Sequence, residues 1–135
     1  MRGEVRFIGR VTRAGEDLST IEVLPEYCDG LYRLGEHKHI AVLYWFHERD
    51  DERHRGTLQV VPRRHGETEL RGVFASHSPS RPNPIGLTEV ELLSVEGCTL
   101  TVRGLDALVD SPIVDIKPVS MDERPDQPAR GGEDR

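Results

Sequence analysis

A run of seven apolar residues, Ile40 to Phe46, constrains this chain most strongly, because it must be removed from water. No longer apolar run occurs in the 135 residues, whereas a membrane-spanning helix needs about 20. The run does not alternate, which is typical of a central β-strand buried on both faces. We therefore expect a soluble chain with no membrane partner, folded around this strand.

Other short apolar or β-branched segments predict further strands. Helix is expected only at Pro25 to Leu34, with Gly35 placed to stop it. About seven strands with little helix predict a mainly β fold, either a small barrel or a sandwich. The predicted strand segments are Val5 to Ile8, Thr20 to Val23, Leu58 to Val61, and a hairpin of Val90 to Leu92 and Leu100 to Val102.

Length and composition predict one domain followed by a tail. Residues 1–119 are long enough to bury a core, whereas residues 120–135 carry one apolar side chain larger than alanine and are expected to be disordered. The first residues lack the apolar core of a signal peptide, which favours the cytoplasm. Cys28 and Cys98 fit a reducing compartment, and no disulfide is needed to hold a core of this size.

The net charge of −6 hides an uneven distribution. Between Arg53 and Pro82, six arginines stand against two glutamates, a local balance of +4 that leaves −10 elsewhere. The acidic total argues against broad nonspecific binding of nucleic acid, but not against a local basic site. The alternative is a solvated arginine-rich loop.

The segment from Gly72 to Leu87 is the most unusual in the chain. Three prolines, at positions 79, 82 and 84, fix φ and push the preceding residues towards extended conformations. A stiff loop that presents Ser76, His77, Ser78, Arg81 and Asn83 suits a binding site, because these residues lose little entropy when a ligand binds. The alternative is a proline-rich crossover between two strands.

A second candidate cluster lies between Gly104 and Pro118. Asp115 and Lys117 share one strand face at spacing i, i+2. A carboxylate there could bind an ammonium group or ribose hydroxyls, or it could form an ordinary ion pair at a strand end. His37, His39 and His47 have no matching cysteine or carboxylate pattern, so no metal site is predicted.

These two segments resemble the TrmO family, also called YaeB or TsaA-like. Its members are S-adenosylmethionine (SAM)-dependent methyltransferases that act on N6 of threonylcarbamoyladenosine at position 37 of tRNA. The family's proline-loop pattern is similar to Gly72 to Leu87 with two changes, Ser76 for Thr and His77 for Arg. The later pattern is similar to Leu105-Asp106 and to Val109 through Val119, and Glu22 to His47 looks like the family's first half.

The resemblance implies a compact single-domain β-barrel that works as a cytoplasmic homodimer, with SAM near the proline loop and the tRNA anticodon loop as partner. By position, the catalytic candidates are His77, Arg81, Asp106 and Asp115. The expected substrate contacts are Arg63, Arg64, Arg71 and Lys117. The expected cofactor contacts are Phe46, His47, Phe74, Ser76, His77, Arg81, Asn83, Ile113, Val114 and Asp115.

The chain departs from the family pattern at several places. A family loop with Pro-Arg-Gln is missing between Ile8 and Asp17, Val109-Asp110 replaces Asp-Gly, and Val119 replaces Tyr. His77 keeps a donor but forfeits the fork of a guanidinium. Two alternatives therefore stay open: a methyltransferase of the same fold that acts on a small molecule, and a non-catalytic module that binds SAM or another adenosine ligand.

Overall fold

The computed structural model describes residues 1–62 and 68–119. The predicted tail and the predicted substrate contacts Arg63 and Arg64 lie outside these residues. The strands are β1 (Gly9–Ala14), β2 (Leu18–Val23), β3 (His39–Trp45), β4 (Gln59–Val60), β5 (Arg71–Gly72), β6 (Ile85–Glu96), β7 (Thr99–Arg103) and β8 (Pro112–Pro118). The helical segments are η1 (Pro25–Leu31), η2 (Leu34–Glu36), η3 (His47–Arg49), α1 (Glu52–Arg55) and η5 (Val73–Ala75).

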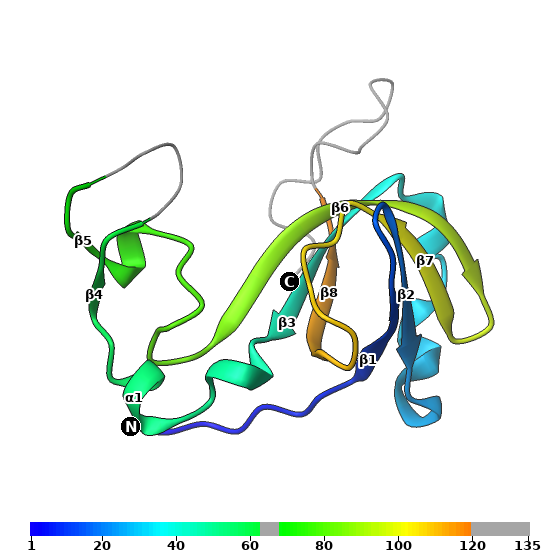
Figure 1. Ribbon diagram of the computed structural model, residues 1–135. Coiled ribbons are helices and arrows are strands. Elements are labelled where there is room, and N and C mark those ends of the chain that lie inside the picture. Colours follow the sequence, from blue (N-terminus) through cyan, green and yellow to red (C-terminus); the bar gives the residue numbers. More distant parts are fainter. Residues whose placement is uncertain (63–67, 120–135) are drawn as a thin grey trace, which may run out of the picture.

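Six antiparallel strands close into a barrel in the order β1-β2-β7-β6-β3-β8 (Figure 1). The mainly β prediction is confirmed, and of its two forms the barrel is correct. Alternate residues of the strands fill the interior, and Val11, Ile21, Ile40, Leu100 and Ile113 have no exposed surface. Closure leaves no unpaired edge in this sheet, so every strand is held on both sides.

The apolar run forms β3, which lies between β6 and β8 as a central strand should. The prediction that both its faces are buried is wrong. Ile40, Val42 and Tyr44 point into the barrel and are buried, whereas Ala41 and Leu43 are half-exposed on the outer face. A barrel has only one interior, so an apolar outer face is left for another surface to cover.

The helix prediction is also partly wrong. Residues 25–31 form the 3₁₀ helix η1, and Gly35 lies inside η2 rather than ending a helix. The α-helix of the described residues is the four-residue α1, where the Asp51 carboxylate accepts a hydrogen bond from the His54 backbone N–H at 2.8 Å. No helix in residues 1–62 or 68–119 is long and apolar enough to cross a membrane.

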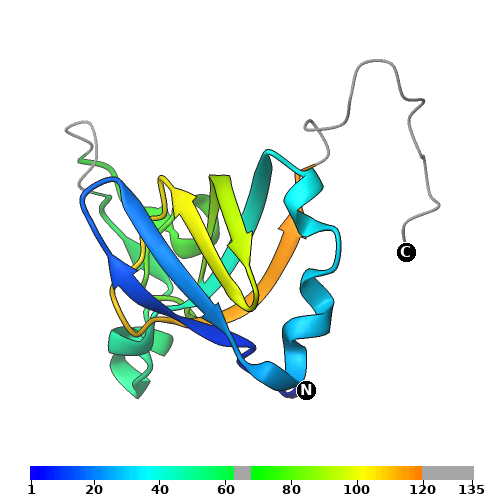
Figure 2. The same ribbon diagram turned by 90° about the vertical axis from the view of Figure 1, so that its right-hand side faces the viewer.

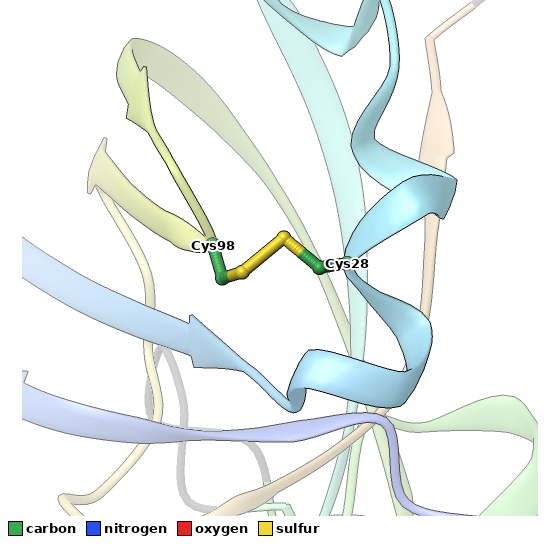
Figure 3. The surroundings of a disulfide bond; sticks show 2 residues. All are labelled: Cys28 and Cys98. Atoms are coloured by element: carbon green, nitrogen blue, oxygen red, sulfur yellow. A yellow bond between two sulfur atoms is a disulfide. The ribbon is translucent and has the colours of Figure 1, made fainter.

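Cys28 and Cys98 form a disulfide, with their Cα atoms 5.4 Å apart (Figure 3). Sequence reasoning held that a core of this size needs no disulfide and did not foresee this bond. The bond joins η1 to the turn between β6 and β7, where Gly97 with φ of +61° reverses the chain and brings Cys98 towards η1. A sequence separation of 70 residues gives no local sign of this approach.

A side lobe, which we define as residues 47–62 and 68–84, stands apart from the barrel (Figure 1). It contains η3, α1, the two-residue strands β4 and β5, η5 and the proline loop. In Figure 2, η1 and η2 cover one flank of the barrel while the lobe lies on another. Leu58, Val61, Leu70 and Phe74 of the lobe are exposed. A two-stranded ribbon this short cannot bury a core of its own, which explains the exposure.

Candidate functional site

Arg81 holds the proline loop in shape from within. Its Nη1 donates to the backbone oxygens of Ser76, at 3.2 Å, and Ser78, at 3.1 Å. The Ser76 hydroxyl accepts from the Ser78 backbone N–H, and the Ser78 hydroxyl accepts from that of Ser80. The sequence predicted a stiff loop from its prolines alone. The structure adds hydrogen bonds that hold the loop in the same way.

Within the side lobe, Arg55 joins α1 to the end of the proline loop. Its Nε donates to the Pro82 oxygen at 2.9 Å, and its Nη2 lies 3.4 Å from Asn83 Oδ1. Asp50 holds the same guanidinium at 2.9 Å, and the group lies 5.7 Å from the centroid of the Trp45 ring. The loop then joins the barrel, since the Phe46 backbone N–H donates to the Pro84 oxygen at 2.7 Å.

The predicted strand-face carboxylate lies on the outside of the barrel next to this junction. In the strand pairing, Leu43 of β3 is opposite Leu87 of β6 on one side and opposite Asp115 of β8 on the other. Asp115 is half-buried, and its Oδ1 accepts from the Ile116 backbone N–H at 2.9 Å. Lys117 follows on the same face and is exposed, which confirms that the two side chains share a face.

Asp106 lies apart from Asp115, on the loop between β7 and β8. It acts electrostatically on Tyr44, whose ring belongs to the barrel interior. Burial raises the pKa of Tyr44, the hydrogen bond with Thr88 lowers it, and the negative charge of Asp106 raises it further. Asp106 itself is exposed on this loop, whereas Asp115 is half-buried on the outer face of β8.

The remaining predicted cofactor contacts are spread from the core to the surface. Phe46 is half-buried and packs edge-on against Tyr44, with 5.5 Å between ring centroids. Ile113 is fully buried and presents no surface to a ligand, and Val114 is half-buried beside it. His47 and His77 are exposed, Phe74 is 79% exposed, and the predicted substrate contact Arg71 is exposed on β5.

Asp110 adopts the left-handed conformation, with φ of 71°. This is the position where the resemblance places a glycine. Aspartate tolerates such a backbone better than most residues, and here its carboxylate also receives Arg10 Nη1 at 2.7 Å. The tight turn is therefore kept without glycine.

A shallow cavity of about 480 Å³ lies elsewhere, beside the disulfide. None of the predicted site residues lines it. Of the polar residues on the proline loop and the outer face of β8, His77, Asn83 and Lys117 are exposed, whereas Arg81 and Asp115 are half-buried.

Sequence reasoning missed a group of residues in or just before α1, of which Arg55 reaches the proline loop: Asp50, Asp51, His54 and Arg55. A signal was present, because Asp51 is a favourable N-cap residue and Gly56 ends the turn. Four helical residues are too few to show a periodic pattern, which is why the turn escaped notice.

The chain resembles several known proteins. It is 51% identical over 111 residues to the S-adenosyl-L-methionine-binding protein of Archaeoglobus fulgidus, covering 82% of this chain and 76% of that protein. It is 48% identical over 110 residues to a probable S-adenosyl-L-methionine-binding protein of Methanothermobacter thermautotrophicus, covering 82% and 75%.

Solved structures and a family model agree with these relatives. A crystal structure of TrmO superposes with a TM-score of 0.68 at 27% identity over 88% of this chain, and one of TrmO from Pseudomonas aeruginosa with 0.66 at 26% identity over 98%. The chain spans 58% and 64% of those two chains. Residues 10–123 match the family model of the tRNA-methyltransferase O N-terminal domain. The chain belongs to the family of tRNA-methyltransferase O N-terminal domains.

Proposed function

We propose that the protein is a SAM-dependent methyltransferase that methylates N6 of threonylcarbamoyladenosine at position 37 of tRNA. The match of residues 10–123 to the tRNA-methyltransferase O N-terminal domain carries this proposal. Two relatives that share about half of their aligned residues with this chain are named for binding SAM, which supports SAM as the cofactor.

The groups around the proline loop suit SAM chemically. Of the three guanidinium nitrogens of Arg81, only Nη1 donates a hydrogen bond to the described residues. Nε and Nη2 can therefore hold a carboxylate. Asp115 has a second oxygen that receives no donor from the described part of the chain, which suits an ammonium group or ribose hydroxyls. Phe46 and the exposed Phe74 offer aromatic surface to a sulfonium ion.

The residues of the chain act by positioning and by moving a proton. Bound SAM supplies an electrophilic methyl group. The stiff loop would hold the cofactor next to the substrate, and this positioning would account for most of the expected rate gain. The N6 proton must leave as the bond from N6 to the methyl group forms and the bond from sulfur to the methyl group breaks. Because the free oxygen of Asp115 would hold the cofactor, exposed His77 is our candidate to accept this proton.

We further propose that the chain works as a homodimer, in the cytoplasm where tRNA is found. Two apolar surfaces support a partner copy: the outer face of β3 and β6, where Leu87 is 61% exposed beside half-exposed Leu43, and the exposed lobe residues. A second copy placed there would also cover the open proline loop.

Two measurements test the function. Calorimetry should show SAM binding that is lost in Asn83→Ala and Asp115→Asn while thermal unfolding stays nearly unchanged. Labelled SAM should then transfer label to bulk tRNA from cells that make threonylcarbamoyladenosine and not to tRNA from cells that lack it. The relatives named only for SAM binding favour the non-catalytic module as second candidate, and binding without transfer to any tRNA or small-molecule pool would establish it.

A further inference from the structure

One imidazole of the side lobe lies between a carboxylate and two guanidinium groups. His54 of α1 has its Nδ1 2.7 Å from Asp51 Oδ2. Its Nε2 lies 3.0 Å from Arg49 Nη1 and 3.2 Å from Arg53 Nη2. Arginine cannot accept a hydrogen bond, so Nε2 must be the acceptor. Nδ1 therefore carries the proton and donates a hydrogen bond to the Asp51 carboxylate. The His54 side chain is 13% exposed, which holds the ring in place.

This arrangement does not suit a general base. The lone pair of Nε2, which a base would use, already accepts hydrogen bonds from two cations. The hydrogen bonds from His54 to Asp51 lower the pKa of Asp51, so this carboxylate stays charged at neutral pH. The imidazole therefore holds two guanidinium groups close together.

In the segment around α1, two carboxylates are bound by neighbouring side chains while two of the arginines pair with no carboxylate of the described residues. Residues 47–56 contain four carboxylates and three arginines. Asp50 is bound by Arg55 and Trp45, and Asp51 by His54. Arg49 and Arg53 form no ion pair with any carboxylate of residues 1–62 or 68–119. Two cations thus share one neutral acceptor.

A phosphate oxygen is a stronger acceptor for guanidinium than an imidazole nitrogen, and one anion relieves the repulsion between two cations. The cluster also has a definite place. Arg55, the next residue on α1, is bound to Pro82 and lies near Asn83. An anion held by Arg49 and Arg53 would therefore lie at the short helix that also holds the end of the proline loop.

We infer that Arg49 and Arg53, held close together by His54, form a binding site for a phosphate group, and that the group comes from the backbone of an RNA substrate. The assignment to RNA rests on the proposed function. The phosphate displaces Nε2 of His54 as acceptor and is held by both guanidinium groups, so it positions the RNA without reading its sequence.

The first test uses inorganic phosphate and the intact protein. The ¹⁵N signals of the His54 ring should move to saturation as phosphate is added, with Nε2 shifting most because it loses two donors. The double variant Arg49→Gln/Arg53→Gln should abolish this saturation. Arg33→Gln/Arg103→Gln is the matched control, since it removes the same charge from exposed arginines that are paired with carboxylates.

The second test uses an anticodon stem-loop RNA without SAM, at several salt concentrations. The Arg49/Arg53 variant should reduce the slope of log K against log salt by about 1, because the contact with one phosphate is lost, whereas the control should not. A shift with inorganic phosphate but an unchanged RNA slope overturns the RNA source. No saturable shift and no change of slope overturns the site itself.

These readouts are independent of methyl transfer. If tRNA receives no label but the His54 signals still saturate in wild type and not in the variant, the phosphate site stands while the proposed function fails. If tRNA is methylated and the Arg49/Arg53 variant binds phosphate and RNA as wild type does, the proposed function stands and this inference fails.

Discussion

At the scale of single residues, Asp110 shows how this chain keeps a turn that its resemblance assigns to glycine. Its φ of 71° is costly for most side chains, by about 1–2 kcal/mol. We expect Asp110→Gly to lie within about 1 kcal/mol of wild type, since relief of the backbone offsets loss of the exposed Arg10 ion pair. Asp110→Val should cost about 1–2 kcal/mol more than the glycine variant, measured by urea unfolding.

Arg10→Ala separates the two contributions to the Asp110 turn. It removes the ion pair and leaves the backbone alone, so it should change the free energy of unfolding by under about 1 kcal/mol. Equal stability of Asp110→Val and Asp110→Gly would contradict the importance of this backbone conformation.

At the scale of elements, the lobe and the proline loop depend on one side chain. Arg55→Ala removes the donor to the Pro82 oxygen, the Asp50 ion pair and the stacking on Trp45. We expect a loss of about 1–2 kcal/mol in the free energy of unfolding, and weaker SAM binding by calorimetry because the loop is less well held. Arg55→Lys should restore little, since one ammonium cannot replace the fork.

Arg6→Ala is the control for this element. Arg6 forms an exposed ion pair with Glu4 and no contact with the loop, so its loss should leave both stability and SAM affinity within error. If Arg55→Ala behaves like Arg6→Ala, the loop is held by its prolines and Arg81 alone.

Elements also show where sequence reasoning succeeded and where it failed. The hairpin of β6 and β7, the short strand before Pro62 and the stiff loop follow from local patterns, and each was predicted. The pairing of β1 with β8 closes the barrel, but no local pattern encodes it. The same limit hid the contact of Arg55 with Pro82 and the Cys28–Cys98 bond, since both join residues far apart in the chain.

At the scale of the whole molecule, the disulfide closes a loop across most of the barrel. In the chain-entropy account, a bond across 70 residues stabilises the folded state by about 4 kcal/mol. Reducing agent, or the Cys28→Ser/Cys98→Ser variant, should lower the free energy of unfolding by about that amount. SAM affinity should not change, because Cys98 and the proline loop lie at opposite ends of β6. Two free thiols found by alkylation in untreated protein would contradict the bond.

The exposed apolar surfaces make the assembly itself testable. Leu87 lies on the outer face formed by β6, β3 and β8, next to half-exposed Leu43, and is 61% exposed in a single chain. If a second copy covers this face, light scattering should give twice the 15.2 kDa chain mass for wild type and the mass of one chain for Leu87→Arg. A buried arginine without a partner would cost more than the contact yields.

Leu18→Arg is the matched control for the dimer face. Leu18 is 42% exposed on β2, which lies three positions from β3 in the barrel order, so this variant should remain dimeric. A wild-type mass of one chain would contradict the homodimer directly. If Leu18→Arg dissociates the protein while Leu87→Arg leaves it dimeric, the partner lies on the β2 side. The proline loop must then bind its ligand without cover from a second copy.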